Sequence, residues 1–255
     1  MHRYIWLLSI LLSLSLGACR KKELPTTAST KGAINVSIQN MVDTEVLVLN
    51  RPTLYALSNG DSFSVSTYNY YLSNFVFTDE HGNQFAEQES YHLVRASDTS
   101  SLHFTINNVP FEQYASVEFL IGVDSVRNFS GAQSGALDPG YGMIWSWNTG
   151  YIMAKMEGHS PQVPTPDHLL SFHIAGYKGQ YNVLQKVKIN LNTKAIVSSS
   201  KSPIINMQSD LATWFTSFTF PGFAKLYSVG SEGINAYSIA QSYSNMMKVT
   251  KVENP

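Results

Sequence analysis

The chain has a single cysteine, Cys19, among its 255 residues. One cysteine excludes an intramolecular disulfide and a zinc site built from several thiolates. Charged residues are also few, at 14% of the chain, and the formal net charge at pH 7 is only −1. No basic surplus therefore predicts binding to nucleic acid.

Catalytic signatures are lacking as well. The sequence contains no nucleophile elbow, phosphate-binding loop, HExxH motif or dinucleotide fingerprint. Its acidic residues are scattered, without a spacing typical of a general acid paired with a general base. We therefore expect a protein that is not an enzyme.

The N-terminus has the pattern of a secretory signal. His2 and Arg3 form a short basic region, residues 6–16 are apolar apart from serines, and Leu16-Gly17-Ala18-Cys19 follows. The apolar stretch is too short to remain as a membrane-spanning helix, and this order of segments is typical of a cleaved signal peptide. The last four residues match the bacterial lipoprotein signal, in which the cysteine becomes the lipidated first residue.

The sequence accordingly predicts a signal peptide over residues 1–18 and a lipidated tether over residues 19–32, which is rich in Pro, Thr and Ser. Several acyl chains on Cys19 would hold the protein firmly at a membrane. We expect it in the cell envelope, anchored to the outer membrane on its periplasmic or its surface face.

Residues 33–255 have the pattern of one all-β domain. Short runs alternate apolar and polar residues at regular spacing, for example Ile34–Ile38, Tyr91–Arg95 and Leu169–Ile174. Turn residues separate the runs, which predicts an antiparallel β-sandwich. One helix is expected near the C-terminus, over residues 231–248, where apolar side chains recur at helical spacing.

The most distinctive stretch is residues 135–158, GALDPGYGMIWSWNTGYIMAKMEG. As a strand it places Met143, Trp145 and Trp147 on one face. Two indoles so close together predict a strand at the centre of a sheet, followed by a second strand over 150–156. Two interpretations remain open, because such a hairpin either fills the core or lines a metal or ligand site.

Six histidines follow the signal peptide, and two of them are the candidate metal ligands. His173 lies on the strand over 169–174, opposite its apolar face, and this strand is expected to neighbour the Trp-rich hairpin. His168 is the second candidate, because a proline-rich loop leads into it. Imidazole and thioether groups suit copper. Common zinc sites use thiolates or carboxylate–histidine motifs, which the chain lacks, so copper is favoured over zinc.

At these residues the chain resembles a known family, the MbnP-like domain, named for a periplasmic protein encoded beside methanobactin genes. The resemblance covers roughly residues 33–250. Its most specific part is the WxWxxGY pattern with a Phe-His pair downstream. The matching segments are Ile121–Asp124, Arg127-Asn128, Gly135–Pro139, Gly142–Tyr151 and Phe172-His173-Ile174.

The resemblance implies an exported β-rich domain that binds copper. Characterised relatives hold copper through histidines and through a tryptophan oxidised to kynurenine, a change attributed to a di-haem partner protein of the peroxidase type. Trp145, Trp147 and His173 match motif positions of the family. The Trp-x-His arrangement of some copper-binding relatives is absent from this chain.

The sequence therefore leaves two functions open. The first is a lipid-anchored envelope protein that binds copper for storage, delivery or uptake, without turnover of its own. The second is a surface β-sandwich that binds a glycan or another protein, with tyrosines and tryptophans as stacking platforms.

Overall fold

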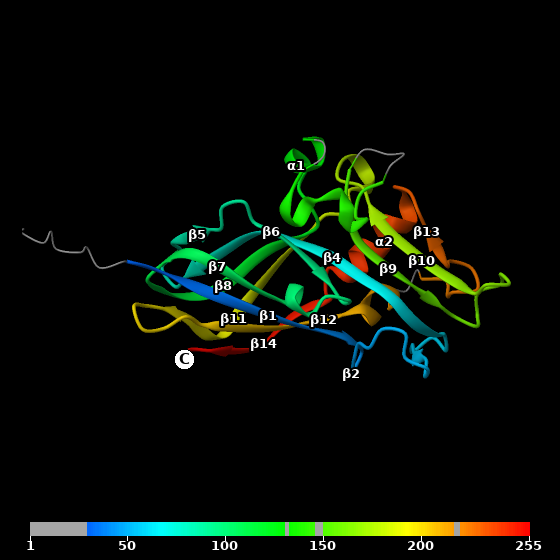
Figure 1. The fold of residues 1–255 in the computed structure, drawn as a ribbon, viewed down its shortest axis with the longest axis horizontal. Coiled ribbons are helices and arrows are strands. Elements are labelled where there is room, and N and C mark those ends of the chain that lie inside the picture. Colours follow the sequence, from blue (N-terminus) through cyan, green and yellow to red (C-terminus); the bar gives the residue numbers. More distant parts are fainter. Residues whose placement is uncertain (1–29, 131–132, 146–149, 217–219) are drawn as a thin grey trace, which may run out of the picture.

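The longest strand, β4 (Ser62–Asp79), is the axis of the larger of two packed β-sheets (Figure 1). The computed structural model describes residues 30–130, 133–145, 150–216 and 220–255. In this part of the chain the larger sheet has the order β11-β8-β4-β9-β10-β13, and three short strands also pair with β4. The remaining strands of this sheet are β3 (Tyr55–Ala56), β5 (Gln84–Ala86), β6 (Tyr91–Arg95), β8 (Glu112–Ile121), β9 (Ile152–His159), β10 (Leu169–Ala175), β11 (Gln185–Val197) and β13 (Ser228–Val229).

The smaller sheet has the order β14-β12-β1-β2, with β7 also paired to β1. Its strands are β1 (Lys31–Val42), β2 (Glu45–Val46), β7 (His103–Pro110), β12 (Ile204–Asp210) and β14 (Met247–Glu253). The described helices are α1 (Ser125–Phe129) and α2 (Ile234–Tyr243), with 3-10 turns η1 (Thr99–Leu102), η2 (Gly135–Leu137), η3 (Pro139–Tyr141), η4 (Gly179–Tyr181) and η5 (Leu211–Phe215). The expected all-β sandwich with a helix near the C-terminus is confirmed, and two strand pairs within it, β1–β12 and β10–β13, are parallel.

Buried tyrosines of β4 join the two sheets. The hydroxyl groups of Tyr68 and Ser209 are 2.8 Å apart, and the Tyr70 hydroxyl donates to Asn40 Oδ1 at 2.9 Å. Both tyrosines are fully buried, so their hydroxyl groups need partners inside the protein. The face of β4 that carries them therefore points at the smaller sheet. The opposite face of the larger sheet is called the outer face below.

Expectations for the Trp-rich stretch need correction. Residues 143–145 do not form a strand, since the only bridge there joins Ile144 to Tyr151. The sheet centre belongs instead to β4 and β9, which pair with each other over six positions from Ser64 to Tyr70. Met143 and Trp145 are nevertheless buried, so the apolar character of the stretch reflects packing against the sheet rather than strand formation. Trp147 lies outside the described residues.

The C-terminal segment also differs from its expected boundaries. Helix α2 ends at Tyr243, and Met247–Glu253 forms β14, paired with β12. Helical spacing in the sequence runs past this point, but pairing with β12 satisfies the backbone groups of residues 247–253 and overrides the local pattern. The partner strand β12 had no counterpart in the sequence prediction. At the other end, β1 begins at Lys31, two residues before the expected start of the domain at residue 33.

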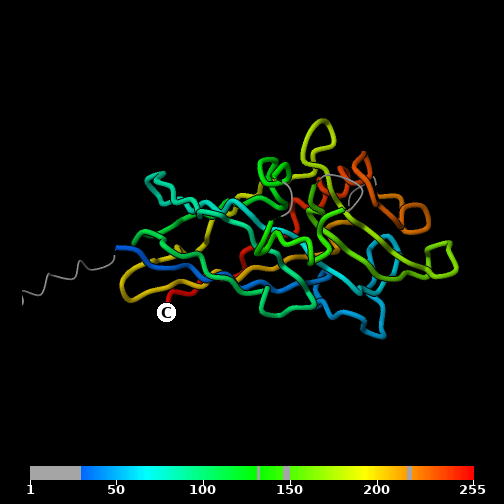
Figure 2. The backbone as a smooth tube through the Cα atoms, turned by 45° about the horizontal axis from the view of Figure 1, so that its top comes forward, coloured from blue at the N-terminus to red at the C-terminus, as the bar shows by residue number. Residues whose placement is uncertain are grey.

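The first described strand starts near the C-terminus. The start of β1 and the C-terminus lie toward the same end in both views (Figures 1 and 2). The loops after β2 and between β9 and β10 lie toward the opposite end. Among the described residues, no helix is both long and apolar enough to cross a membrane.

Candidate functional site

His173 lies on β10, on the outer face of the larger sheet. Its neighbours Phe172 and Ile174 are fully buried on the inner face, as strand alternation requires. The His173 side chain keeps 19% of its surface exposed, and its Nε2 lies 2.8 Å from Glu157 Oε1 on the adjacent strand β9. The structure therefore places His173 where the sequence predicted it, opposite the apolar face of its strand.

Three neighbouring strands supply the groups around this pair. The Thr67 hydroxyl on β4 donates to Glu157 Oε2 at 3.0 Å, and Lys155 Nζ on β9 lies 3.3 Å from Glu157 Oε1. Ser171 Oγ is 3.5 Å from His173 Nε2. We call these five residues the His173 cluster. Glu157 is its hub, because three of the other four side chains contact its two oxygens.

The pKa values show which member carries charge. Burial lowers the pKa of His173 below its usual value and outweighs the raising effect of Glu157. Burial alone would raise the pKa of Glu157, but the hydrogen bond from His173 and the charge of Lys155 bring it below its usual value. Both shifts agree, so near pH 7 the pair consists of a neutral imidazole and an ionised carboxylate.

This state fixes the tautomer of the imidazole. An ionised carboxylate only accepts hydrogen bonds, so Nε2 of His173 must carry the proton that Glu157 accepts. A neutral ring has one proton, which leaves a lone pair on Nδ1. Histidines that bind metals use this arrangement, with one nitrogen free for the metal and the other donating to a carboxylate or carbonyl.

His168, the second predicted ligand, is held elsewhere. It is an exposed residue in a left-handed backbone conformation (φ 52°) just before β10, and its Nδ1 lies 2.8 Å from its own loop's Val163 carbonyl oxygen. His173 lies four positions after Leu169 along the strand, or roughly 13 Å at about 3.3 Å per residue, and His168 is one residue further. Metal–nitrogen bonds are only about 2 Å long, so the structure does not bring the two rings together.

One of the two predicted tryptophans lies in the core, and the other lies outside the described residues. Trp145 is 5% exposed and belongs to the hydrophobic core, with the fully buried Met143 two residues earlier. Trp147 falls in residues 146–149 and Cys19 in residues 1–29, both outside the described ranges.

Of the two predicted ligands, His173 has the surroundings that suit a metal ion. No three His, Cys, Asp or Glu side chains gather around one point within residues 30–130, 133–145, 150–216 and 220–255. His173 Nδ1 fits a copper ligand, because it is a neutral imidazole nitrogen already supported by a carboxylate. Cu(I) accepts few ligands and favours soft ones.

Sequence reasoning missed Glu157, Lys155 and Thr67. Residues 154–157 did contain a signal, since strand alternation places Lys155 and Glu157 on the face opposite Ala154 and Met156. What the sequence lacks is the register between β9 and β10, which sets Ser171 against Glu157 and His173 against Lys155. Only this register brings the histidine within reach of the carboxylate.

Comparisons with known proteins agree with this fold. A family model described as MbnP matches residues 31–232 of the chain. The solved structure of MbnP from Methylosinus trichosporium matches with a TM-score of 0.52 and 13% sequence identity, over 81% of this chain and 84% of that chain, which is a likeness of fold. None of the curated proteins matches the sequence. Because the family model covers well over half of its length, the chain belongs to the MbnP family.

Proposed function

We propose that this protein is a lipid-anchored envelope protein that binds copper without turning over a substrate. Membership of the MbnP family supports a metal-related role in the periplasm. The observation that carries the proposal is the 2.8 Å contact between His173 Nε2 and Glu157 Oε1, which leaves Nδ1 with a lone pair. His173 Nδ1 is then the ligand that this chain contributes from its described residues.

The proposed copper is cargo for storage, delivery or uptake. Glu157 orients the ring and raises its basicity, and Thr67 and Lys155 hold the carboxylate in turn. The positive charge of Lys155 lies near the site and repels a bound cation. This charge favours Cu(I) over Cu(II), because the monovalent ion is repelled less.

The experiment is a copper-binding series on the mature protein. Copper retained after dialysis is measured for the wild type and for His173→Ala. We expect His173→Ala to lose bound copper, whereas His168→Ala and His81→Ala should retain it. The His168 ring is held by its own loop, and His81 is exposed at the tip of the β4–β5 hairpin. Equal retention by the wild type and His173→Ala would remove His173 from the site.

A modified tryptophan is the second part of the proposal. We expect a di-haem partner protein of the peroxidase type to oxidise Trp145 or Trp147 to kynurenine, which exchanges one indole carbon for an oxygen atom. Intact mass of the protein, expressed alone and together with such a partner, measures this change. Trp145→Phe and Trp147→Phe variants assign the position. An unchanged mass in the presence of an active partner would rule out the modification.

A further inference from the structure

A groove crosses the outer side of the smaller sheet, the side turned away from β4. Its volume is about 650 Å³, and it continues into a second hollow of about 390 Å³ that shares Ser37, His103 and Asn206 with it. The His173 cluster lies on the other sheet, so this groove is separate from the proposed copper site.

The floor of the groove consists of uncharged polar side chains in register. On the central strands β1 and β12, Ser37 is paired with Asn206 and Gln39 with Gln208. His103 of β7 continues the row of Ser37 on its other side. Neighbouring strands are about 4.8 Å apart, and side chains of one face recur about every 6.7 Å along a strand. The floor therefore offers a regular grid of hydrogen-bonding groups.

These groups have bonding capacity left for a ligand. Gln208 Nε2 donates to Gln39 Oε1 at 3.3 Å, and Asn206 Nδ2 donates to Glu253 Oε1 at 3.3 Å. Both bonds are long, and each amide has two donor hydrogens and two acceptor lone pairs. Hydroxyl groups, which both donate and accept, suit such a floor.

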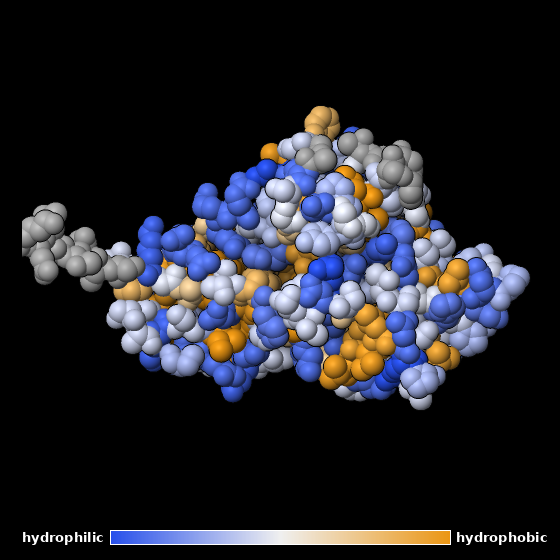
Figure 3. Space-filling model, viewed as in Figure 1, coloured by the Kyte–Doolittle hydropathy of each residue, from blue (hydrophilic) through white to orange (hydrophobic). Residues whose placement is uncertain are grey.

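Two apolar walls border the polar floor along the edge of β1 that faces away from β12. Val46 and Leu47 form the first wall, beside the end of β1, and Ala96 and Leu102 form the second, next to the start of β7. Val46 is 49% exposed, and Figure 3 shows an apolar patch in the region where Figure 1 places β2. A ligand that fits this cross-section has polar edges and apolar C–H faces.

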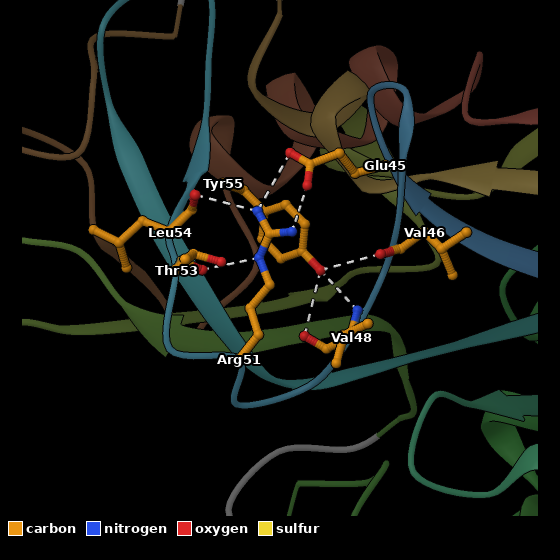
Figure 4. Close-up of polar contacts among 7 residues, drawn as sticks. All are labelled: Glu45, Val46, Val48, Arg51, Thr53, Leu54 and Tyr55. Atoms are coloured by element: carbon orange, nitrogen blue, oxygen red, sulfur yellow. Dashed lines mark hydrogen bonds and ion pairs between the residues drawn. The ribbon is translucent and has the colours of Figure 1, made fainter.

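The first wall is held rigid by a dense polar network (Figure 4). The Tyr55 hydroxyl accepts from Val48 N at 2.7 Å and lies 3.3 Å from the Val46 carbonyl oxygen. The Arg51 guanidinium lies over the Tyr55 ring, 3.3 Å from its centroid, and binds Glu45 through both terminal nitrogens. A wall fixed before binding lowers the ordering cost of the complex.

Charge and strand pairing narrow the ligand class. At the rim Lys251 and Glu253 neutralise each other at 2.9 Å, and the floor carries no carboxylate or ammonium group. A charged ligand would find no partner of opposite sign there. An extended peptide binds best along a free strand edge. Along the groove β12 is paired on both sides, and β1 lacks a strand partner only over residues 38–40 of one edge, where Asn40 O already accepts from Leu47 N. We propose that this groove binds a neutral oligosaccharide, with its hydroxyl groups on the Ser37–Gln39–Asn206–Gln208 floor.

The test is titration of the mature protein, treated with chelator to remove copper, with defined probes. The neutral probes are chitotetraose and cellotetraose, the anionic probe is tetragalacturonic acid, and the peptide probe is an uncharged Gly/Ser/Thr peptide. We expect a neutral tetrasaccharide to bind, and the amide signals of Gln39, Asn206 and Gln208 to shift in NMR spectra. Because copper is absent, the outcome does not depend on the proposed copper function.

Variants locate the binding. The floor variant, which combines Asn206→Ala with Gln208→Ala, should weaken sugar binding at least about tenfold. Each substitution removes hydrogen bonds to the sugar. Asn190→Ala is the matched control, because it removes an exposed amide from β11 of the other sheet. Thermal midpoints should match the wild type for both. Absence of neutral-sugar binding, equal binding by the floor variant, or preference for the peptide or the anionic probe would each overturn the proposal.

Discussion

His173 and Glu157 form a diagonal pair across β9 and β10, with 2.8 Å between Nε2 and Oε1. The bond is made by a neutral ring and an ionised carboxylate, since the pKa of each group is lowered. The consequence of this pair lies in the tautomer of His173, which keeps Nδ1 available as a ligand.

Replacing Glu157 should weaken copper binding without abolishing it. In Glu157→Gln the side chain keeps its shape but loses its charge, so it no longer raises the basicity of the ring. Loss of such a supporting partner typically costs about 10–100-fold in metal affinity. Competition with a Cu(I) chelator measures the change. Glu118→Gln is a suitable control, since Glu118 pairs with Lys186 on β8 and β11, away from His173. An unchanged affinity in Glu157→Gln would show that the carboxylate does not support the ligand.

Stability should fall in mild acid because of His173. Its folded pKa is below the reference value of 6.5, so the unfolded chain takes up a proton first as the pH falls. Unfolding is then favoured progressively below about pH 6.5. Urea unfolding between pH 8 and pH 5 should show a shallower pH dependence for His173→Gln than for the wild type. His81→Gln, an exposed turn variant, should follow the wild type. Identical slopes for the wild type and His173→Gln would contradict the lowered pKa.

The core between the sheets should depend strongly on Trp214. Its indole is fully buried, with ring centroids 5.3 Å from Tyr243 and 5.9 Å from Tyr68. Trp214→Ala should lower the free energy of unfolding by about 3–5 kcal/mol, through lost burial and a residual cavity. Phe129→Ala removes a ring that is 75% exposed and should change it by less than about 0.5 kcal/mol. A small effect of Trp214→Ala in denaturant unfolding would place the indole outside the core.

Anchoring is tested at Cys19. Cys19→Ala removes the thiol that the lipoprotein signal predicts as the lipid attachment site, so the protein should leave the membrane fraction or fail to mature. Fractionation and intact mass measure both effects. Ser29→Ala, in the expected tether, is a control that should leave both unchanged. Membrane association and mass equal to those of the wild type would exclude lipid on Cys19.

Several elements of the fold could be predicted from local patterns in the sequence. Alternation in Ile34–Ile38 and Leu169–Ile174 predicted strands that are present as β1 and β10. The side chain of Asp210, a residue type that favours helix N-caps, accepts from Ala212 N at the start of η5. These features are local, so a few neighbouring residues determine them.

Long-range pairing could not be predicted in the same way. The segment Met247–Glu253 is a strand only because β12 lies beside it, and the paired residues of the two strands are 38 to 49 positions apart in the chain. The same holds for the site, where the register of β9 against β10 decides that Glu157 meets His173. The sequence predicted His173 as a candidate ligand, because strand alternation and family resemblance both pointed to this residue.

The most direct test of the account observes the two nitrogens of His173 separately. The mature protein is labelled with 15N at its histidines, and NMR spectra are recorded near pH 7 before and after addition of Cu(I), with His173→Ala used to assign the signals. We predict that Nε2 of His173 is protonated in both states and that the Nδ1 signal shifts when copper binds. Bound copper with an unchanged Nδ1 signal, or no copper bound at all, would contradict the proposal that His173 Nδ1 binds copper.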